Sequence, residues 1–210
     1  MTKPKGGVIG CGGISRFHFA GLAKAGADVV HIADVRQDAA APYVSQFGAR
    51  YSRDYRDLIA DPEITVVSVL AHGRYHLEMC LAALSAGKDV ICEKTLTDSA
   101  DEAAQIVAAV RSSGRLFFTA YMKGFFPAMQ KARELLPSLG RLFSAQVRTY
   151  QPWGNYYDID ASSVPGEVFT KYGGAVMKCA ASHLINLTLS FLCRPQSLYA
   201  NVDYVPGSNF

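Results

Sequence analysis

Short runs of apolar and β-branched residues alternate with helical patterns along the first 120 residues of the chain. The runs predict strands at 7–10, 29–33, 64–70, 89–92 and 116–119. Helical patterns fall between them, at 14–24, 38–46, 54–59, 75–85 and 99–110. Strands that alternate with helices are joined by right-handed crossovers. This order therefore predicts an α/β fold with a doubly wound parallel sheet.

A different region begins near Tyr121, where the alternation stops. It holds helical patterns at 128–136 and 176–192, predicted strands at 142–149 and 198–205, and a long aperiodic stretch at 150–172. That stretch either forms a lip over a substrate or covers the core; its aromatic and acidic candidates are Tyr150, Trp153, Tyr156, Tyr157 and Asp158. We expect two domains, 1–121 and 122–210, of which the second is an incomplete α+β domain. Two strands make a marginal sheet with open edges, so we expect this domain to pack against a partner.

Composition narrows the class of protein. Half of the 210 residues are hydrophobic and 19% are charged, which excludes disordered and fibrous chains. The net charge of +3 comes from scattered basic residues, so we expect no nucleic-acid partner. No apolar run is long enough to span a bilayer, and no secretory segment follows the N-terminus, so we expect a cytoplasmic protein. The five cysteines lack zinc-site spacing, which favours buried thiols and no metal.

A glycine-rich turn lies between the first predicted strand and the first helix. Its residues are Gly10, Cys11, Gly12, Gly13, Ile14 and Ser15. The first glycine permits a tight turn, and the second lets a pyrophosphate approach backbone N–H groups at the helix N-terminus. The third position needs a small residue for helix–strand packing and is Ser15, a departure from Gly or Ala. In this strand–turn–helix context the pattern predicts a Rossmann dinucleotide site.

Asp34 closes the second predicted strand, about twenty residues after the turn. A carboxylate at this position binds the ribose hydroxyls of the adenosine and repels a 2′-phosphate, which favours NAD over NADP. Arg36 could bind such a phosphate and keeps NADP possible. The alternative is a glycine-rich turn followed by an aspartate that caps a helix.

Polar side chains also follow the later strands, where ligands of open α/β sheets gather. Lys94, next to Glu93, could stabilise a developing alkoxide, or the two could form a solvated ion pair. His72 and His76 either face the cofactor or cap the following helix. His183 is four residues from Cys179 on the last helix, where a core histidine, a Cys–His dyad and a metal pair are the alternatives.

Four segments together resemble the Gfo/Idh/MocA oxidoreductases, the family of glucose–fructose oxidoreductase and inositol dehydrogenases. They are 7–18, 61–76, 82–94 and 173–187, and the run from Ala82 to Lys94 is similar to the family consensus almost throughout. The resemblance implies an NAD(P)-binding domain at 1–121 and a partial substrate and oligomerisation domain at 122–210. It places the family lysine on Lys94 and the family histidine on His183. The expected cofactor residues are Gly10, Cys11, Gly12, Gly13, Ile14, Asp34, Arg36, Ala71, His72, His76, Glu93 and Lys94.

Several positions depart from the family pattern. Thr95 replaces the proline of Glu-Lys-Pro, and Ala71-His72 replaces Thr-Pro. Cys179 replaces the aspartate four residues before the helix histidine, and Asn186 stands where many members have Asp. The chain is also shorter than family members. These changes leave the expected fold and nucleotide site intact, but they bear on the mechanism.

The resemblance favours an NAD(P)-dependent dehydrogenase that moves hydride between a sugar-like or polyol alcohol and nicotinamide, with Lys94 and His183 as the catalytic pair. One alternative is a non-catalytic nucleotide sensor of the same fold, which the loss of the aspartate favours. Another is a glycosidase that uses NAD in a transient oxidation. The partners we expect are a small sugar or polyol and a second copy of the chain, joined through the second-domain sheet, with no membrane.

Overall fold

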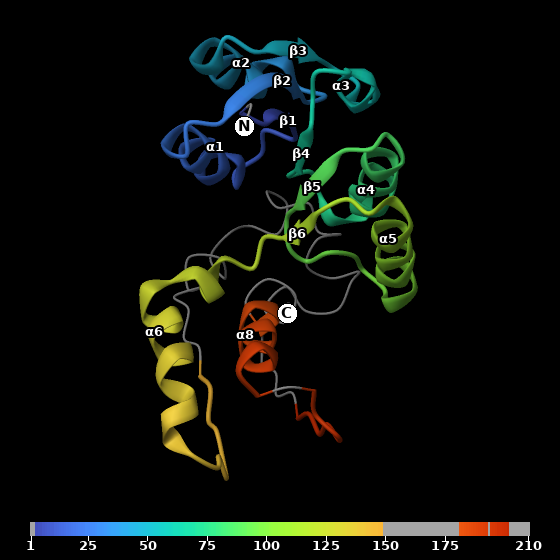
Figure 1. Ribbon diagram of the computed structural model, residues 1–210. Coiled ribbons are helices and arrows are strands. Elements are labelled where there is room, and N and C mark those ends of the chain that lie inside the picture. Colours follow the sequence, from blue (N-terminus) through green and yellow to red (C-terminus); the bar gives the residue numbers. More distant parts are fainter. Residues whose placement is uncertain (1–2, 149–180, 193, 202–210) are drawn as a thin grey trace, which may run out of the picture. The chain divides into compact units, whose positions relative to one another are not determined.

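The computed structural model describes residues 3–148, 181–192 and 194–201. The chain divides into two compact units, residues 1–120 and 121–210, which are considered separately (Figure 1).

The first unit is built on a six-stranded parallel sheet. Its strands are β1 (Lys5–Ile9), β2 (Asp28–Ala33), β3 (Arg50–Ser52), β4 (Val66–Val69), β5 (Asp89–Cys92) and β6 (Phe117–Thr119). Their order is β3-β2-β1-β4-β5-β6, and every neighbouring pair is parallel. From β1 the chain adds β2 and β3 toward one edge of the sheet, and from β4 it adds β5 and β6 toward the other edge. The connections that follow β1 and β4 therefore diverge between these two neighbouring strands. Ligands of such sheets bind at the carboxyl ends of the strands beside this point.

Five helices connect the strands. They are α1 (Ser15–Lys24), α2 (Gln37–Phe47), α3 (Tyr55–Ala60), α4 (His76–Ser85) and α5 (Ala100–Ser113). Side chains cap the N-termini of two of them: the Asp54 carboxylate accepts from Arg56 N–H at 2.9 Å before α3, and the Ser99 hydroxyl accepts from Glu102 N–H at 3.2 Å before α5. Gly48 and Gly114 end α2 and α5 in the left-handed conformation.

The sheet is covered on both faces, because successive side chains of each strand point to opposite sides. On one face Val8 and Ile32 join Phe19 of α1 and Ala40 of α2. On the other face the strand residues next in sequence, Ile9 and Ala33, belong to a second cluster. The helices α3, α4 and α5 contribute Leu58, Leu84 and Ile106 to it. Figure 1 shows α1 and α2 beside the first strands and α4 and α5 beside the later ones. The doubly wound α/β fold predicted from the sequence is thus confirmed.

Two details of this unit differ from expectation. The strand Arg50–Ser52 was not expected, because three residues on a sheet edge carry no readable alternation. Within the helix expected at 99–110, the apolar side chain of Val107 is 44% exposed, whereas that of Ile106 beside it is 1% exposed. Adjacent residues on a helix are about 100° apart, so the core admits only one of the two.

The second unit contains α6 (Pro127–Leu135) and α8 (Ser182–Leu192), with 3₁₀ helices Met122–Phe125 and Leu136–Leu139. Arg133 of α6 donates to the Ser190 hydroxyl of α8 at 3.3 Å, and its guanidinium lies over the Phe191 ring. The strands expected at 142–149 and 198–205 are wrong for the parts that the structure describes, since 142–148 and 198–201 are not strands. A strand requires a hydrogen-bonded neighbour, and no described residue pairs with either segment. The aperiodic stretch 150–172 lies outside the described residues.

Gly7 of β1 supplies a test of this packing. A Cβ added there would lie 2.7 Å from Leu58 Cδ2 and 2.9 Å from Ile64 Cδ1, in a core where neither side chain has room to move. We expect Gly7→Ala to lower the free energy of unfolding in urea by roughly 1–3 kcal/mol through overpacking. Gly6→Ala is the matched control, because its Cβ would have one ordinary contact at 3.7 Å. Equal stability of the two variants would contradict the packing of α3 on β1.

Candidate functional site

The turn after β1 is shaped by close backbone contacts. Gly10 has φ of +98°, and a Cβ there would lie 2.8 Å from Ala71 N, so only glycine fits between the ends of β1 and β4. Ser15 is fully buried, and its hydroxyl donates to the Gly12 carbonyl at 2.7 Å. The departure at the third position of the fingerprint thus closes the turn. A Cβ on Gly12 or Gly13 would meet nothing within 4 Å, so the space above the turn is open.

The Asp34 carboxylate joins this turn to the end of β2. Its Oδ2 accepts from Cys11 N–H at 2.6 Å, and its Oδ1 accepts from Arg36 N–H at 2.8 Å. The Asp34 carbonyl accepts from the Tyr51 hydroxyl at 3.0 Å. The aspartate therefore links the glycine turn to the backbone at the end of β2, and this role was not expected from the sequence.

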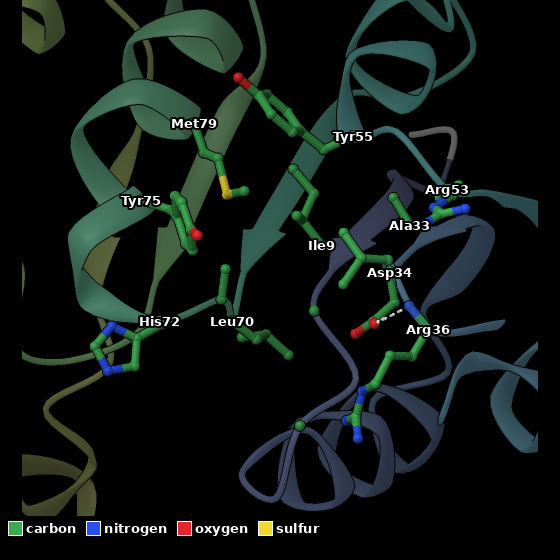
Figure 2. A pocket seen from close by; sticks show the side chains of 14 residues that line it. Ile9, Ala33, Asp34, Arg36, Arg53, Tyr55, Leu70, His72, Tyr75 and Met79 are labelled. Carbon is green, nitrogen blue, oxygen red and sulfur yellow. Dashed lines mark hydrogen bonds between the residues drawn. The ribbon is translucent and has the colours of Figure 1, made fainter. Parts of the chain in front are cut away.

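A pocket of about 270 Å³ opens where β1, β2 and β4 end (Figure 2). Of the residues expected to bind a cofactor, those that line it are Gly10, Gly12, Asp34, Arg36, Ala71 and His72. Figure 2 shows the Asp34 carboxylate beside the Arg36 backbone on one wall and His72 on the opposite wall. The expected residues that do not line it are Cys11, Gly13, Ile14, His76, Glu93 and Lys94.

Sequence reasoning missed one wall of the pocket. Tyr55, Tyr75 and Met79 form it, from α3 and the start of α4, and Arg53 adds a second cation near Asp34. Tyr75 and Met79 are four residues apart and share a helix face, a spacing that was readable in the sequence. Burial and a hydrogen bond to Glu78 raise the pKa of Tyr55 to about 12, so its ring presents a neutral face.

Cys11 lies beneath the turn and takes part only through its backbone. Its side chain is 7% exposed, and burial together with the charge of Asp34 raises the pKa of the thiol to about 12. A thiol of this kind is chemically inert. Cys80 and Cys92 are buried and free as well, whereas Cys179 and Cys193 lie outside the described residues.

Glu93 and Lys94 leave the end of β5. Glu93 is 8% exposed; its Oε1 lies 2.7 Å from His18 Nε2, and its Oε2 accepts from Lys94 N–H at 3.0 Å. Burial alone would raise the pKa of Glu93, but the hydrogen bond and charge of His18 and the contacts of Lys94 hold it below 4.5. Glu93 therefore pairs with His18 of α1, a partner that was not expected from the sequence, and it contacts Lys94 through the backbone N–H. The Lys94 side chain is half-buried, and the Lys94–Thr95 peptide bond is cis.

His76 is a buried residue at the start of α4, and its ring contacts backbone carbonyls near the pocket. It is 1% exposed, and Nε2 lies 2.9 Å from the Ala71 carbonyl. Nδ1 lies 3.0 Å from the carbonyls of Thr95 and Leu96. Both ring nitrogens thus face backbone oxygens, and the cofactor contact expected of His76 stays a prediction.

His183 belongs to the second unit, on α8. It is 6% exposed, shares a helix face with buried Leu187, and meets the Tyr121 ring edge-on at 5.6 Å between centroids. Burial raises the pKa of Tyr121, although a hydrogen bond with Ser182 opposes the shift. Cys179, at the position of the family aspartate, lies outside the described residues, as does the alternative acid Asp158.

Residues 3–148, 181–192 and 194–201 contain neither a metal-binding cluster nor a membrane-spanning helix. No group of three or more His, Cys, Asp or Glu side chains there could hold a metal ion. None of the helices in these ranges is both long and apolar enough to cross a bilayer.

Residues 5–121 match the model of a family described as the oxidoreductase family with an NAD-binding Rossmann fold, GFO_IDH_MocA. Inositol 2-dehydrogenase 3 of Saccharopolyspora erythraea is 34% identical over 137 residues, which are 64% of this chain and 40% of that protein. Inositol 2-dehydrogenase of Pseudomonas savastanoi pv. phaseolicola is 36% identical over 141 residues, 65% of this chain and 42% of that protein.

Among solved structures, levoglucosan dehydrogenase in complex with NADH and L-sorbose superposes with a TM-score of 0.80 at 26% identity. The match covers 90% of this chain and 53% of that one. The chain therefore spans about half the length of the relatives it matches.

The buried Glu93 carboxylate makes the stability of the first unit depend on pH. Because its folded pKa lies below the ordinary 4.5, Glu93 stabilises the fold above that pH and loses this contribution as the pH falls through the folded value. We expect Glu93→Gln to lose less free energy of unfolding than the wild type between pH 7 and pH 3. Glu134→Gln is the control, since Glu134 is 65% exposed and should follow the wild type. Parallel curves for all three proteins would contradict the buried ion pair.

Proposed function

The chain belongs to the Gfo/Idh/MocA family of NAD-binding oxidoreductases, and on this premise we propose that it transfers hydride between NAD and a sugar-like or polyol alcohol. The observation that carries the proposal is the Asp34 carboxylate, which lines the same pocket as the glycine turn and is held there by two backbone N–H groups. The names of the relatives favour an alcohol of the inositol or anhydrosugar class.

The residues of the pocket fit a dinucleotide. Open space above Gly12 and Gly13 leaves the turn and the N-terminus of α1 accessible to a pyrophosphate, which N–H groups there can bind. Asp34 would hold the adenosine ribose, and the wall of Tyr55 and Met79 offers an apolar surface beside it. Arg36 and Arg53 line the same pocket, so NADP remains the alternative cofactor.

When bound, NAD supplies the nicotinamide ring that accepts or returns hydride. We assign Lys94 to the substrate oxygen, where its ammonium group stabilises negative charge as the hydroxyl loses its proton. We assign His183 as the base that takes this proton. In the proposed division of labour, residues 1–121 bind the nucleotide, and residues 122–210 contribute to the substrate site and to association with a second copy.

Cys179 favours a second candidate function. A carboxylate would orient the imidazole of His183 and stabilise its charged form, and a cysteine does neither. The second candidate is therefore a protein that binds NAD without turning over an alcohol.

Asp34 distinguishes the two cofactors. We expect Asp34→Ala to weaken NAD binding about tenfold or more, through loss of charge-assisted hydrogen bonds, and NADP binding much less. Asp34→Asn keeps one acceptor oxygen, so it retains the bond to only one of the two backbone N–H groups and loses the negative charge. Asp38→Ala, at an exposed acid of the first turn of α2, is the control. The affinities are measured by calorimetry, and unchanged values for Asp34→Ala would refute the assignment.

Turnover decides between the two functions. The assay follows NADH absorbance with myo-inositol and levoglucosan as substrates. We expect oxidation of at least one of them, and a loss of about 10²-fold or more in kcat for Lys94→Ala and His183→Ala. NAD binding with no turnover of either substrate, and no gain from Cys179→Asp, would favour the second candidate. Full activity of both alanine variants would refute the catalytic pair.

A further inference from the structure

Lys94 follows the last ladder bond of β5, where the backbone needs other support. Glu93 N–H donates to the Val69 carbonyl at 2.9 Å, and beyond this bond the chain leaves the sheet and runs to α5. Strand ends without ladder partners open readily unless side chains hold them. A lysine that must meet a substrate oxygen needs its backbone fixed, since a displacement of about 1 Å can cost about 10²-fold in rate.

The residue before Lys94 is held by His18. His18 lies on α1, one turn after Ser15, whose hydroxyl closes the glycine turn. Its contact of 2.7 Å with Glu93 Oε1 joins two segments that are 75 residues apart in sequence. Both side chains are largely buried, at 18% and 10% exposure, so solvent screens the pair little. Glu93 in turn holds the Lys94 backbone, because its second carboxylate oxygen accepts a hydrogen bond from Lys94 N–H.

The residues after Lys94 are held by His76. Nδ1 faces the Thr95 and Leu96 carbonyls, and Nε2 faces the Ala71 carbonyl on the pocket wall. The His76 ring thus lies between the segment that follows β5 and the turn that follows β4, and the nitrogen that carries the proton donates to one of them. Its side chain is 1% exposed, so water does not compete for these bonds.

We propose that His18 and His76 are positioning residues for Lys94, which they serve by fixing the backbone on its two sides. Neither histidine lines the pocket. The inference rests on the proposed function, because that function is what requires Lys94 to be fixed. It also implies that the glycine turn and the lysine move together, since α1 carries both Ser15 and His18.

The deciding measurement is amide hydrogen exchange of residues 93–97, followed by mass spectrometry on the full chain without nucleotide. His18→Ala and His76→Ala should each accelerate exchange there about tenfold or more, the effect of losing hydrogen bonds to a charged or buried group. His18→Gln replaces Nε2 with an amide donor and should restore slow exchange. His31→Gln is the matched control: His31 is also buried, at 7% exposure, but bonds Asp61 and Ser52.

Kinetics with NAD and myo-inositol or levoglucosan separate positioning from simple loss of stability. His18→Ala should lower kcat about tenfold with KM for the alcohol nearly unchanged, as expected when a group acts only on the transition state. His18→Gln should recover most of this loss, and His31→Gln should keep wild-type kcat.

Unchanged exchange at 93–97 in His18→Ala, or equal acceleration in His31→Gln, would overturn the inference. If His76→Ala does not fold, the two His18 variants decide. The exchange readout needs no nucleotide, so a failure of NAD binding would refute the proposed function alone.

Discussion

The close passage of Gly10 past the end of β4 is the constraint on which the site depends. With φ of +98° and no Cβ, this residue lets the turn after β1 reach within contact of Ala71 N. The pocket, the glycine turn and the start of α4 all meet at this point, because β1 and β4 are neighbours in the sheet and their connections diverge. A larger residue at position 10 would separate β1 from β4 and open the pocket that the two strands share.

Charged side chains then fix the loops that the sheet leaves unsupported. Asp34 bonds the backbone of Cys11 and of Arg36, so a single carboxylate holds both the turn and the end of β2. Glu93 likewise holds the backbone at the end of β5, because it contacts His18 and accepts from Lys94 N–H. The pKa of the buried Glu93 carboxylate lies below its ordinary value because His18 and the Lys94 contacts compensate for the lost water. The backbone at the glycine turn and at the end of β5 is therefore held by bonds to the chain's own side chains.

Local signals made most of the first unit predictable, and their absence explains the failures. β5 and α4 have clear patterns, bounded by Gly87 and by turn residues, and both were expected at nearly their observed residues. Arg50–Ser52 is a strand only because β2 lies beside it, which no local pattern reveals. The reverse holds at 142–148, where an apolar run lacks a neighbour among the described residues. Asp34 was found by its spacing from the glycine turn, whereas the pocket wall of Tyr55 and Met79 depends on how α3 and α4 pack together.

The central claim is that the glycine turn and the end of β2 form one nucleotide site. The most direct test is an NMR titration of the ¹⁵N-labelled chain with NAD, with amide shifts followed residue by residue. The account predicts that the largest shifts fall on residues 10–14, 34–36 and 71–72, and that Cys11 and Arg36 shift together because Asp34 bonds both. Saturable binding with shifts confined to other residues, or no shift at millimolar NAD, would contradict it.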